Sequence, residues 1–172
     1  LRPFFHLVTI PWIASLAIVS VLAIGFAIPA VRHLREAAPP ELRLQIETPS
    51  TNVPLEFALS PDGRSIAYVA SGTGAQRLWV RALDKTDGRP LPGTEGAEYP
   101  FWSPDSRSIG FFALNKLYRI DISGGAPQAL CDSSGNGGAS WGTDGTIVFT
   151  SSFGSGLLRV SAAGGTPQVL TT

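Results

Sequence analysis

From residue 57 onward the sequence repeats itself about every 40 residues, and this periodicity constrains the fold more than any other feature. Three segments align on a shared acid followed by alternating apolar residues: FALSPDGRSIAYVA, PFWSPDSRSIGFFA and ASWGTDGTIVFTS. Their acids, Asp62, Asp105 and Asp144, are 43 and 39 residues apart. A second landmark (LWVRAL, LYRIDI, LLRVSA) and a third (GGAPQAL, GGTPQVL) recur in the same order. Such a period indicates stacked units, either propeller blades or a solenoid.

The residues within each unit favour strands. Apolar positions alternate with a period of two, as at Ile66 and Tyr68, and they are rich in β-branched and aromatic types. Of the 19 glycines, 18 follow residue 50, which suits tight turns and disfavours helices. We expect the first unit to contain strands at about 57–60, 65–70, 77–83 and 90–92. Four antiparallel strands in about 40 residues make one blade of a β-propeller.

Several repeated positions are expected to be structural. The Ser-Pro-Asp-Gly run at 60–63 predicts a turn, because proline presets φ, the aspartate accepts backbone N–H groups and glycine takes the left-handed position. The marker acids occupy equivalent places in separate units, so they do not converge as a catalytic acid pair would. The predicted structural positions are Asp62, Asp105, Asp144, Pro61, Pro104, Trp102, Trp141, Trp79 and Tyr118. Trp79 and Tyr118 share one strand position with Leu158, which predicts packing between blades, with an aromatic ligand surface as the alternative.

The N-terminal part of the chain is different in kind. Residues 7–31 contain no charge over 25 residues. A helix of that length rises about 37 Å, enough to cross a hydrocarbon core of about 30 Å. A buried core helix and a signal peptide are the alternatives; a signal peptide has a shorter apolar core and a small-x-small cleavage site, which Ile28-Pro29-Ala30 matches poorly. We therefore expect one transmembrane helix followed by an all-β domain: a partial β-propeller of about three four-stranded antiparallel blades.

This reading divides the chain into segments. Residues 1–6 would end an upstream cytoplasmic region, 7–31 would span the membrane, 32–56 would form a Pro-rich stalk or linker, and 57–172 would form the partial propeller. The units would be about 57–99, 100–138 and 139–172. Alternation at Leu42, Leu44 and Ile46 suggests a short strand within the stalk. Because three blades do not close a ring, and because no Met occurs, we expect a piece of a longer protein with more repeats after Thr172.

The residue inventory excludes several kinds of site. Both histidines, His6 and His33, flank the apolar segment, so the repeats cannot assemble a Ser-His-Asp triad. Cys131 is the single cysteine, which excludes a disulfide framework and a cysteine-rich metal site. Lysine and arginine balance aspartate and glutamate at 13 each, which argues against nucleic-acid binding. No catalytic, cofactor-binding or metal-binding residue is predicted in this stretch.

Two resemblances follow from these motifs. The order W-S-P-D-G, I-A-[FY], L-[WY]-V and G-G-x-P-x-x-L resembles the TolB-type, WD40-like propeller repeat over about residues 57–172. This sequence departs from the pattern at Leu59 in place of tryptophan, Ser106 in place of glycine and Gly142-Thr143 in place of Ser-Pro. These departures leave the exact turn geometry open. The whole arrangement resembles the outer half of certain bacterial membrane-bound serine/threonine protein kinases, which implies a kinase domain before the span and a propeller outside the cytoplasm.

The functional hypotheses follow from that second resemblance. The first is an extracytoplasmic sensor or protein-interaction propeller on a single-pass anchor in the bacterial cytoplasmic membrane, with ATP and Mg needed only by an upstream kinase domain. The alternatives are the propeller of a membrane-anchored one-component transcription regulator, the propeller of a serine peptidase, and a TolB-like periplasmic scaffold. Residues 7–31 would contact the lipid bilayer, a homodimer is conceivable, and the ligand or protein partner is unknown. The positive-inside rule conflicts with this orientation, because Arg2 precedes the span while Arg32 and Arg35 follow it.

Overall fold

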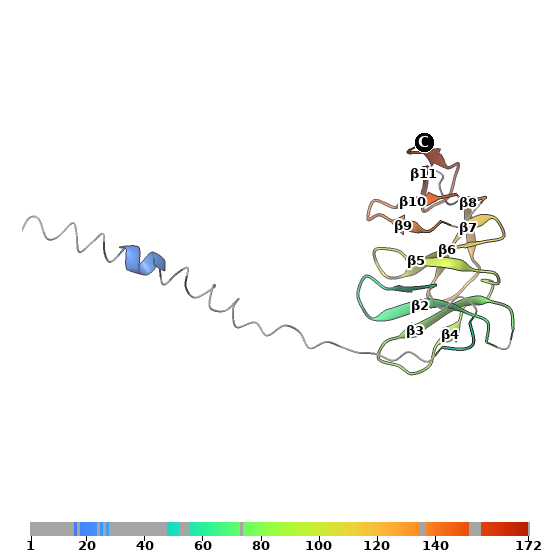
Figure 1. Cartoon of the computed structure of the whole chain (residues 1–172), viewed down its shortest axis with the longest axis horizontal. Helices are drawn as coiled ribbons and strands as arrows, with labels where there is room; N and C mark the ends of the chain where they lie inside the picture. Colours follow the sequence, from blue (N-terminus) through green and yellow to red (C-terminus); the bar gives the residue numbers. More distant parts are fainter. Residues whose placement is uncertain are drawn as a thin grey trace, which may run out of the picture. The chain divides into compact units, whose positions relative to one another are not determined.

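The structure is a computed structural model, and it divides the chain into two units, Leu1–Leu44 and Gln45–Thr172. It describes residues 16, 18–23, 25, 27, 48–51, 56–72, 74–134, 137–151 and 156–171 (Figure 1). In the first unit the described residues are helical and exposed, and Ser20 Oγ donates a hydrogen bond to the Leu16 carbonyl at 2.8 Å. Within these described residues there is no helix of the length and apolarity that crossing a membrane requires. The other positions of the predicted span, and the predicted strand at Leu42–Ile46, lie outside the described residues.

The second unit contains three antiparallel sheets, each with four strands in chain order. The first sheet comprises β1 (Phe57–Leu59), β2 (Ser65–Ala70), β3 (Arg77–Ala82) and β4 (Arg89–Pro90). The second comprises β5 (Glu98–Trp102), β6 (Ser108–Ala113), β7 (Lys116–Asp121) and β8 (Gln128–Asp132). The third comprises β9 (Ala139–Trp141), β10 (Thr146–Thr150), β11 (Leu157–Ser161) and β12 (Gln168–Val169). The expectation of repeated four-stranded sheets resembling propeller blades is confirmed.

The strand limits differ slightly from those expected in the first unit. Ser60 opens a turn and does not extend β1, because its carbonyl and hydroxyl both bond within that turn. β4 is short and lies at 89–90, and Leu91 continues the pairing through one bond to the Leu78 carbonyl at 2.8 Å. β5 begins at Glu98, two residues before the expected boundary at 100. The strands themselves follow the alternation that the sequence shows.

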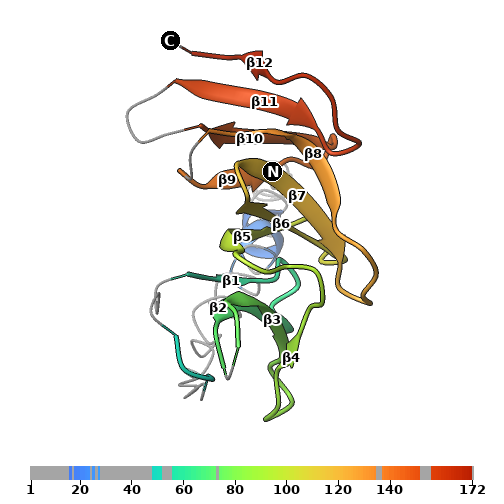
Figure 2. The same cartoon turned by 90° about the vertical axis from the view of Figure 1, so that its right-hand side faces the viewer.

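The sheets lie against one another in chain order, and the first strands β1, β5 and β9 are neighbours (Figure 2). One apolar cluster fills the seam between the first and second sheets, with Val69 and Leu78 on one side and Ile109 and Phe111 on the other. A second cluster fills the seam between the second and third sheets and includes Phe112, Leu117, Ile147 and Phe149. Because successive side chains of a strand point to opposite faces, each inner strand contributes to two layers.

A third cluster covers the face of the first sheet that points away from the second. It contains Ile66, Tyr68 and Ala70, with Trp79 and Leu83 packed against it. The same face carries Phe57 and Leu59 on β1, which are 53% and 57% exposed. This face, called the outer face below, is equivalent to the faces that are buried at the seams in the other two sheets.

Candidate functional site

The repeated aspartates organise the turn between the first two strands of each sheet. In the first sheet Asp62 Oδ1 accepts from Ser60 Oγ at 2.6 Å and from the Arg64 N–H at 3.0 Å. Ser60 Oγ also accepts from the Ser65 N–H at 2.8 Å. Gly63 has a φ of 68°, the left-handed conformation that the turn requires. The carboxylate is therefore occupied in holding the turn.

The second sheet repeats this arrangement with one change of residue. Asp105 Oδ1 accepts from Ser103 Oγ at 2.6 Å and from the Arg107 N–H at 3.1 Å. Ser106 replaces glycine at a φ of 60°, and its hydroxyl accepts from the Asp62 N–H of the preceding sheet at 3.2 Å. The substitution that left the turn geometry open thus supplies a contact between adjacent turns.

The third sheet reaches the same geometry without the serine. Gly142 has no hydroxyl to offer, and Thr146 supplies one from the other end of the turn. Asp144 accepts from the Thr146 N–H and from its hydroxyl, each at 3.0 Å. Gly145 takes the left-handed position with a φ of 79°. The three acids lie in three separate turns, each bonded within its own.

These bonds lower the pKa of all three carboxyl groups. The Ser60 hydroxyl is the main cause for Asp62, and the Ser103 hydroxyl is the main cause for Asp105. For Asp144 the Thr146 backbone N–H lowers the pKa most. Each group donates nothing and remains ionised at neutral pH, which suits a turn anchor and not a general acid. Pro61 and Pro104 precede Asp62 and Asp105 directly and are not buried.

The predicted aromatic positions pair across strands. Phe111 and Tyr118 stack with their ring centroids 5.4 Å apart, at the seam between the first and second sheets. Leu158 faces Phe149 at the next seam. Trp79 stacks on Tyr68 at 6.4 Å but lies on the outer face, where it packs against no other sheet among the described residues. One strand position therefore serves two seams and one outer face.

Trp102 and Trp141 each reach back toward the preceding sheet. Trp102 Nε1 donates to the Ala58 carbonyl at 2.9 Å, and its ring is 7% exposed. Trp141 packs in the second seam against the edge of Phe101. Leu59 holds the equivalent place in the first sheet and has no preceding sheet to reach among the described residues.

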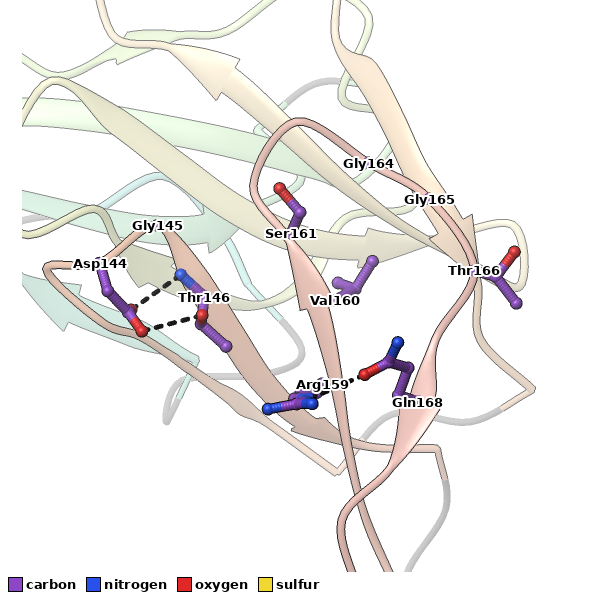
Figure 3. Close-up of a pocket in the computed structure, with 10 residues that line it drawn as sticks. All are labelled: Asp144, Gly145, Thr146, Arg159, Val160, Ser161, Gly164, Gly165, Thr166 and Gln168. Atoms are coloured by element: carbon purple, nitrogen blue, oxygen red, sulfur yellow. Dashed lines mark hydrogen bonds between the residues drawn. The ribbon is translucent and has the colours of Figure 1, made fainter.

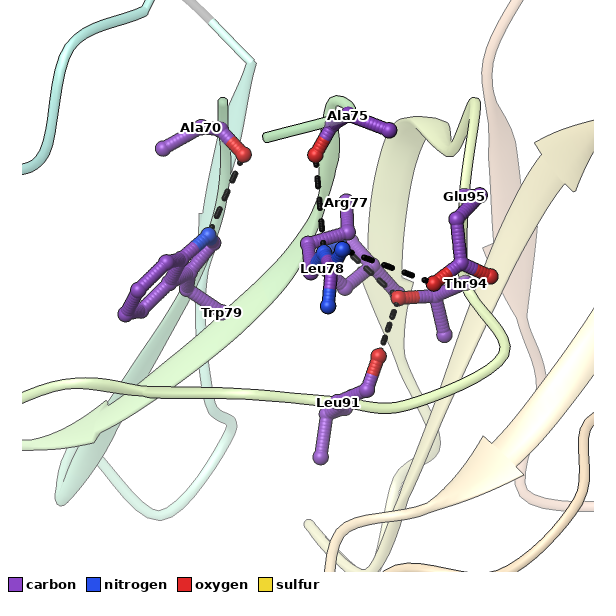
Figure 4. A network of polar contacts seen from close by, with 8 residues as sticks. All are labelled: Ala70, Ala75, Arg77, Leu78, Trp79, Leu91, Thr94 and Glu95. Atoms are coloured by element: carbon purple, nitrogen blue, oxygen red, sulfur yellow. Dashed lines mark hydrogen bonds and ion pairs between the residues drawn. The ribbon is translucent and has the colours of Figure 1, made fainter. Parts of the chain in front are cut away.

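A polar network that the sequence did not reveal secures the outer strands of the first sheet (Figure 4). Thr94, fully buried, accepts from the Leu78 N–H at 3.0 Å and donates to the Leu91 carbonyl at 2.6 Å. Beside it Arg77 pairs with Glu95 at 3.7 Å, where both side chains are partly exposed. No sequence signal marked Thr94, because its partner Leu78 lies 16 residues earlier.

An open cavity of about 380 Å³ lies on the third sheet, between the β9–β10 turn and the β11–β12 loop (Figure 3). Its polar wall includes Asp144, Thr146 and Ser161, and Arg159 Nε donates to Gln168 Oε1 at 3.0 Å. The second sheet contains the same arginine–glutamine pair, Arg119 and Gln128, at 3.0 Å. The pair is therefore a feature of the repeat and not of a specialised pocket.

The first sheet has a cavity of about 500 Å³ at the corresponding turn, lined by residues 63–65 and 82–84. Its wall offers one acid, Asp84, and one cation, Arg64, on an open surface. Neither cavity contains a nucleophile held by a base. In the part of the chain that the structure describes, no three His, Cys, Asp or Glu side chains are grouped as metal ligands would be.

Cys131 is partly buried on β8, and burial raises the pKa of its thiol. A raised pKa keeps the thiol protonated, which makes it a weak nucleophile. This placement matches a structural cysteine. The described residues thus offer packed seams and turns, with no assembled catalytic group.

Comparison with known proteins identifies the fold. No protein-family model and no curated protein matches the chain. TolB from Agrobacterium tumefaciens aligns with a TM-score of 0.54 at 20% identity, over 66% of this chain and 47% of that chain. TolB from Acinetobacter baumannii aligns with a TM-score of 0.53 at 22% identity, over 67% of this chain and 32% of that one. Puromycin hydrolase aligns with a TM-score of 0.50 at 22% identity, over 67% of this chain and 21% of that one.

The chain spans less than half the length of each of these structures. At these identities the likeness establishes a TolB-like β-propeller fold and no specific activity. The fold that the repeat pattern implied is confirmed in this coarser form.

Proposed function

We propose that the three sheets belong to an extracytoplasmic interaction or sensing propeller, held at the bacterial cytoplasmic membrane by a single helix over 7–31. The observation that supports this most is the order of segments: 25 uncharged residues, then a proline-rich stretch, then the repeated sheets. An uncharged run of this length is typical of a membrane span. The hydrogen bond from Ser20 to the Leu16 carbonyl is the way a serine satisfies its hydroxyl inside an apolar helix.

We further propose that the whole protein passes its signal to a cytoplasmic effector, a serine/threonine kinase in the reading favoured by the sequence resemblance. The repeats themselves would act by binding, because they contain no histidine and their aspartates are used in turns. A transcription regulator, a serine peptidase and a periplasmic scaffold remain the competing contexts. The likeness to puromycin hydrolase is one of fold and favours none of them.

Two reporter fusions after Thr171 test the topology: alkaline phosphatase, which is active outside the cytoplasm, and green fluorescent protein, which is fluorescent inside it. We expect phosphatase activity in the membrane fraction and no fluorescence. The variant Val19→Arg with Leu22→Arg should release the fusion from the membrane, since each arginine at a span centre costs about 2.5–3.5 kcal/mol. Ser20→Ala is the matched control and should remain anchored. A fluorescent membrane-bound fusion would reverse the orientation, and a soluble wild type would refute the anchor.

A second experiment tests signalling in the full-length protein. Deleting residues 57–171 while keeping 1–56 should change the output of the cytoplasmic effector, measured as autophosphorylation in membrane vesicles. An output identical to that of the intact protein would contradict a sensing role.

A further inference from the structure

The joint between the first two sheets depends on one carboxylate. Glu56 precedes β1, and its backbone carbonyl accepts from the Val69 N–H of β2 at 3.0 Å. Its side chain crosses the seam, where Oε2 accepts from the Tyr99 N–H of β5 at 3.1 Å. Glu56 is thus fixed to one sheet by its backbone and to the next by its side chain.

The segment that Glu56 holds is irregular. The pairing of β5 with β6 shifts register between Glu98 and Phe101, which places a bulge at Tyr99. Tyr99 has a φ of 49°, a left-handed conformation that a residue with a bulky side chain adopts only when its surroundings impose it. The carboxylate of Glu56 is the partner that occupies the N–H of this residue.

The electrostatic surroundings of Glu56 favour its neutral form. Burial is the largest cause that raises its pKa, and the Glu98 carboxylate on the bulged strand raises it further, against the lowering effect of the Tyr99 N–H. β1 and β2, the other strands packed against it, carry no charged residue. A proton on Glu56 removes the repulsion between the two carboxyl groups, and the carbonyl oxygen of the acid still accepts from Tyr99.

We propose that Glu56 is a proton-sensitive joint that holds the bulge of the second sheet more firmly when its carboxyl group is protonated. The joint lies where the chain enters the repeats, so acid would stiffen the connection between residues 48–56 and the first seam. This goes beyond the proposed function and does not depend on membrane topology. The sign is opposite to that of the turn aspartates, which are held as anions.

Amide hydrogen exchange of the whole chain between pH 4 and 7 tests the joint. The protection factor of the Tyr99 amide should rise as pH falls through the pKa of Glu56. In Glu56→Gln, which keeps an acceptor oxygen and loses the charge, protection should be high and independent of pH. In Glu56→Ala it should fall at least about tenfold at every pH, since a buried N–H loses its acceptor. Glu98→Gln should weaken the rise in the wild type.

Two references separate this joint from overall stability. The Thr146 amide, bonded to Asp144, should lose protection in acid, and Glu95→Gln should leave the Tyr99 profile unchanged. A flat or falling Tyr99 profile in the wild type, or a Glu56→Gln profile like that of the wild type, would overturn the proposal. So would full protection of Tyr99 in Glu56→Ala.

Discussion

Replacing Thr94 by valine tests the network that fastens the outer strands of the first sheet. Valine has the shape of threonine and lacks its hydroxyl, so Thr94→Val leaves the Leu78 N–H without an acceptor and the Leu91 carbonyl without its 2.6 Å donor. Leu78, Leu91 and Thr94 are all fully buried, so water cannot replace either bond without opening the sheet. An unsatisfied buried polar group costs about 1–3 kcal/mol, and the two together should lower the free energy of unfolding by about 2–4 kcal/mol.

The matched control is Thr94→Ser, which keeps the hydroxyl and removes one buried methyl group. That change should cost about 1 kcal/mol. Urea unfolding of the whole chain in mild detergent, followed by tryptophan fluorescence, measures both free energies, and unchanged slopes would show that the folded and unfolded states are comparable. The reasoning fails if Thr94→Val is no more destabilising than Thr94→Ser. That result would mean that packing, and not the two hydrogen bonds, holds the strands together.

Three further changes test turns and seams. The lowered pKa of Asp105 gives stability that is present above its unfolded value of about 4 and is lost as pH falls through the folded value; in acid urea titrations Asp105→Asn should therefore lose less stability than the wild type, and equal losses would exclude this role. Leu114 is 81% exposed at a φ of 49°, so Leu114→Asn should stabilise the β6–β7 hairpin by about 1 kcal/mol, and a lower melting temperature would contradict the strain. A Cβ at Gly110 would lie 2.1 Å from the Phe101 ring, so Gly110→Ala should destabilise by about 1–3 kcal/mol, whereas a neutral result would mean that the ring moves freely.

The repeat made the sheets and their turns predictable, because both depend on residues close in the sequence. Alternating apolar residues define the strands, and the bonds of Asp62 and Asp105 reach only two residues in either direction. The third turn was less predictable, because the Thr146 hydroxyl takes the role of the missing serine. Local patterns therefore fix the architecture of each sheet even where one residue departs from the repeat.

Contacts across the seams were not predictable in the same way. The bond from Tyr99 to Glu56 joins residues 43 apart, and the bulge that presents it changes the register of β5. Trp79 and Tyr118 share a strand position, yet only Tyr118 lies in a seam. A pattern that repeats cannot distinguish a sheet with a neighbour on one side from a sheet with neighbours on both.

One substitution in the sequence does mark the outer face of the first sheet. The residue two positions after Trp79 is Arg81, whereas the equivalent residues are Ile120 and Val160, which are 2% and 4% exposed in the seams. An arginine with its Nε bonded to the Lys85 carbonyl at 2.7 Å keeps its charge at the edge of this face. Terminal units of repeat proteins require such polar residues, because their outer faces lack a neighbouring unit to bury them. The exposed Phe57 and Leu59 show that this adaptation is incomplete, so the face combines an aromatic centre with a charged rim, as surfaces that bind another macromolecule do.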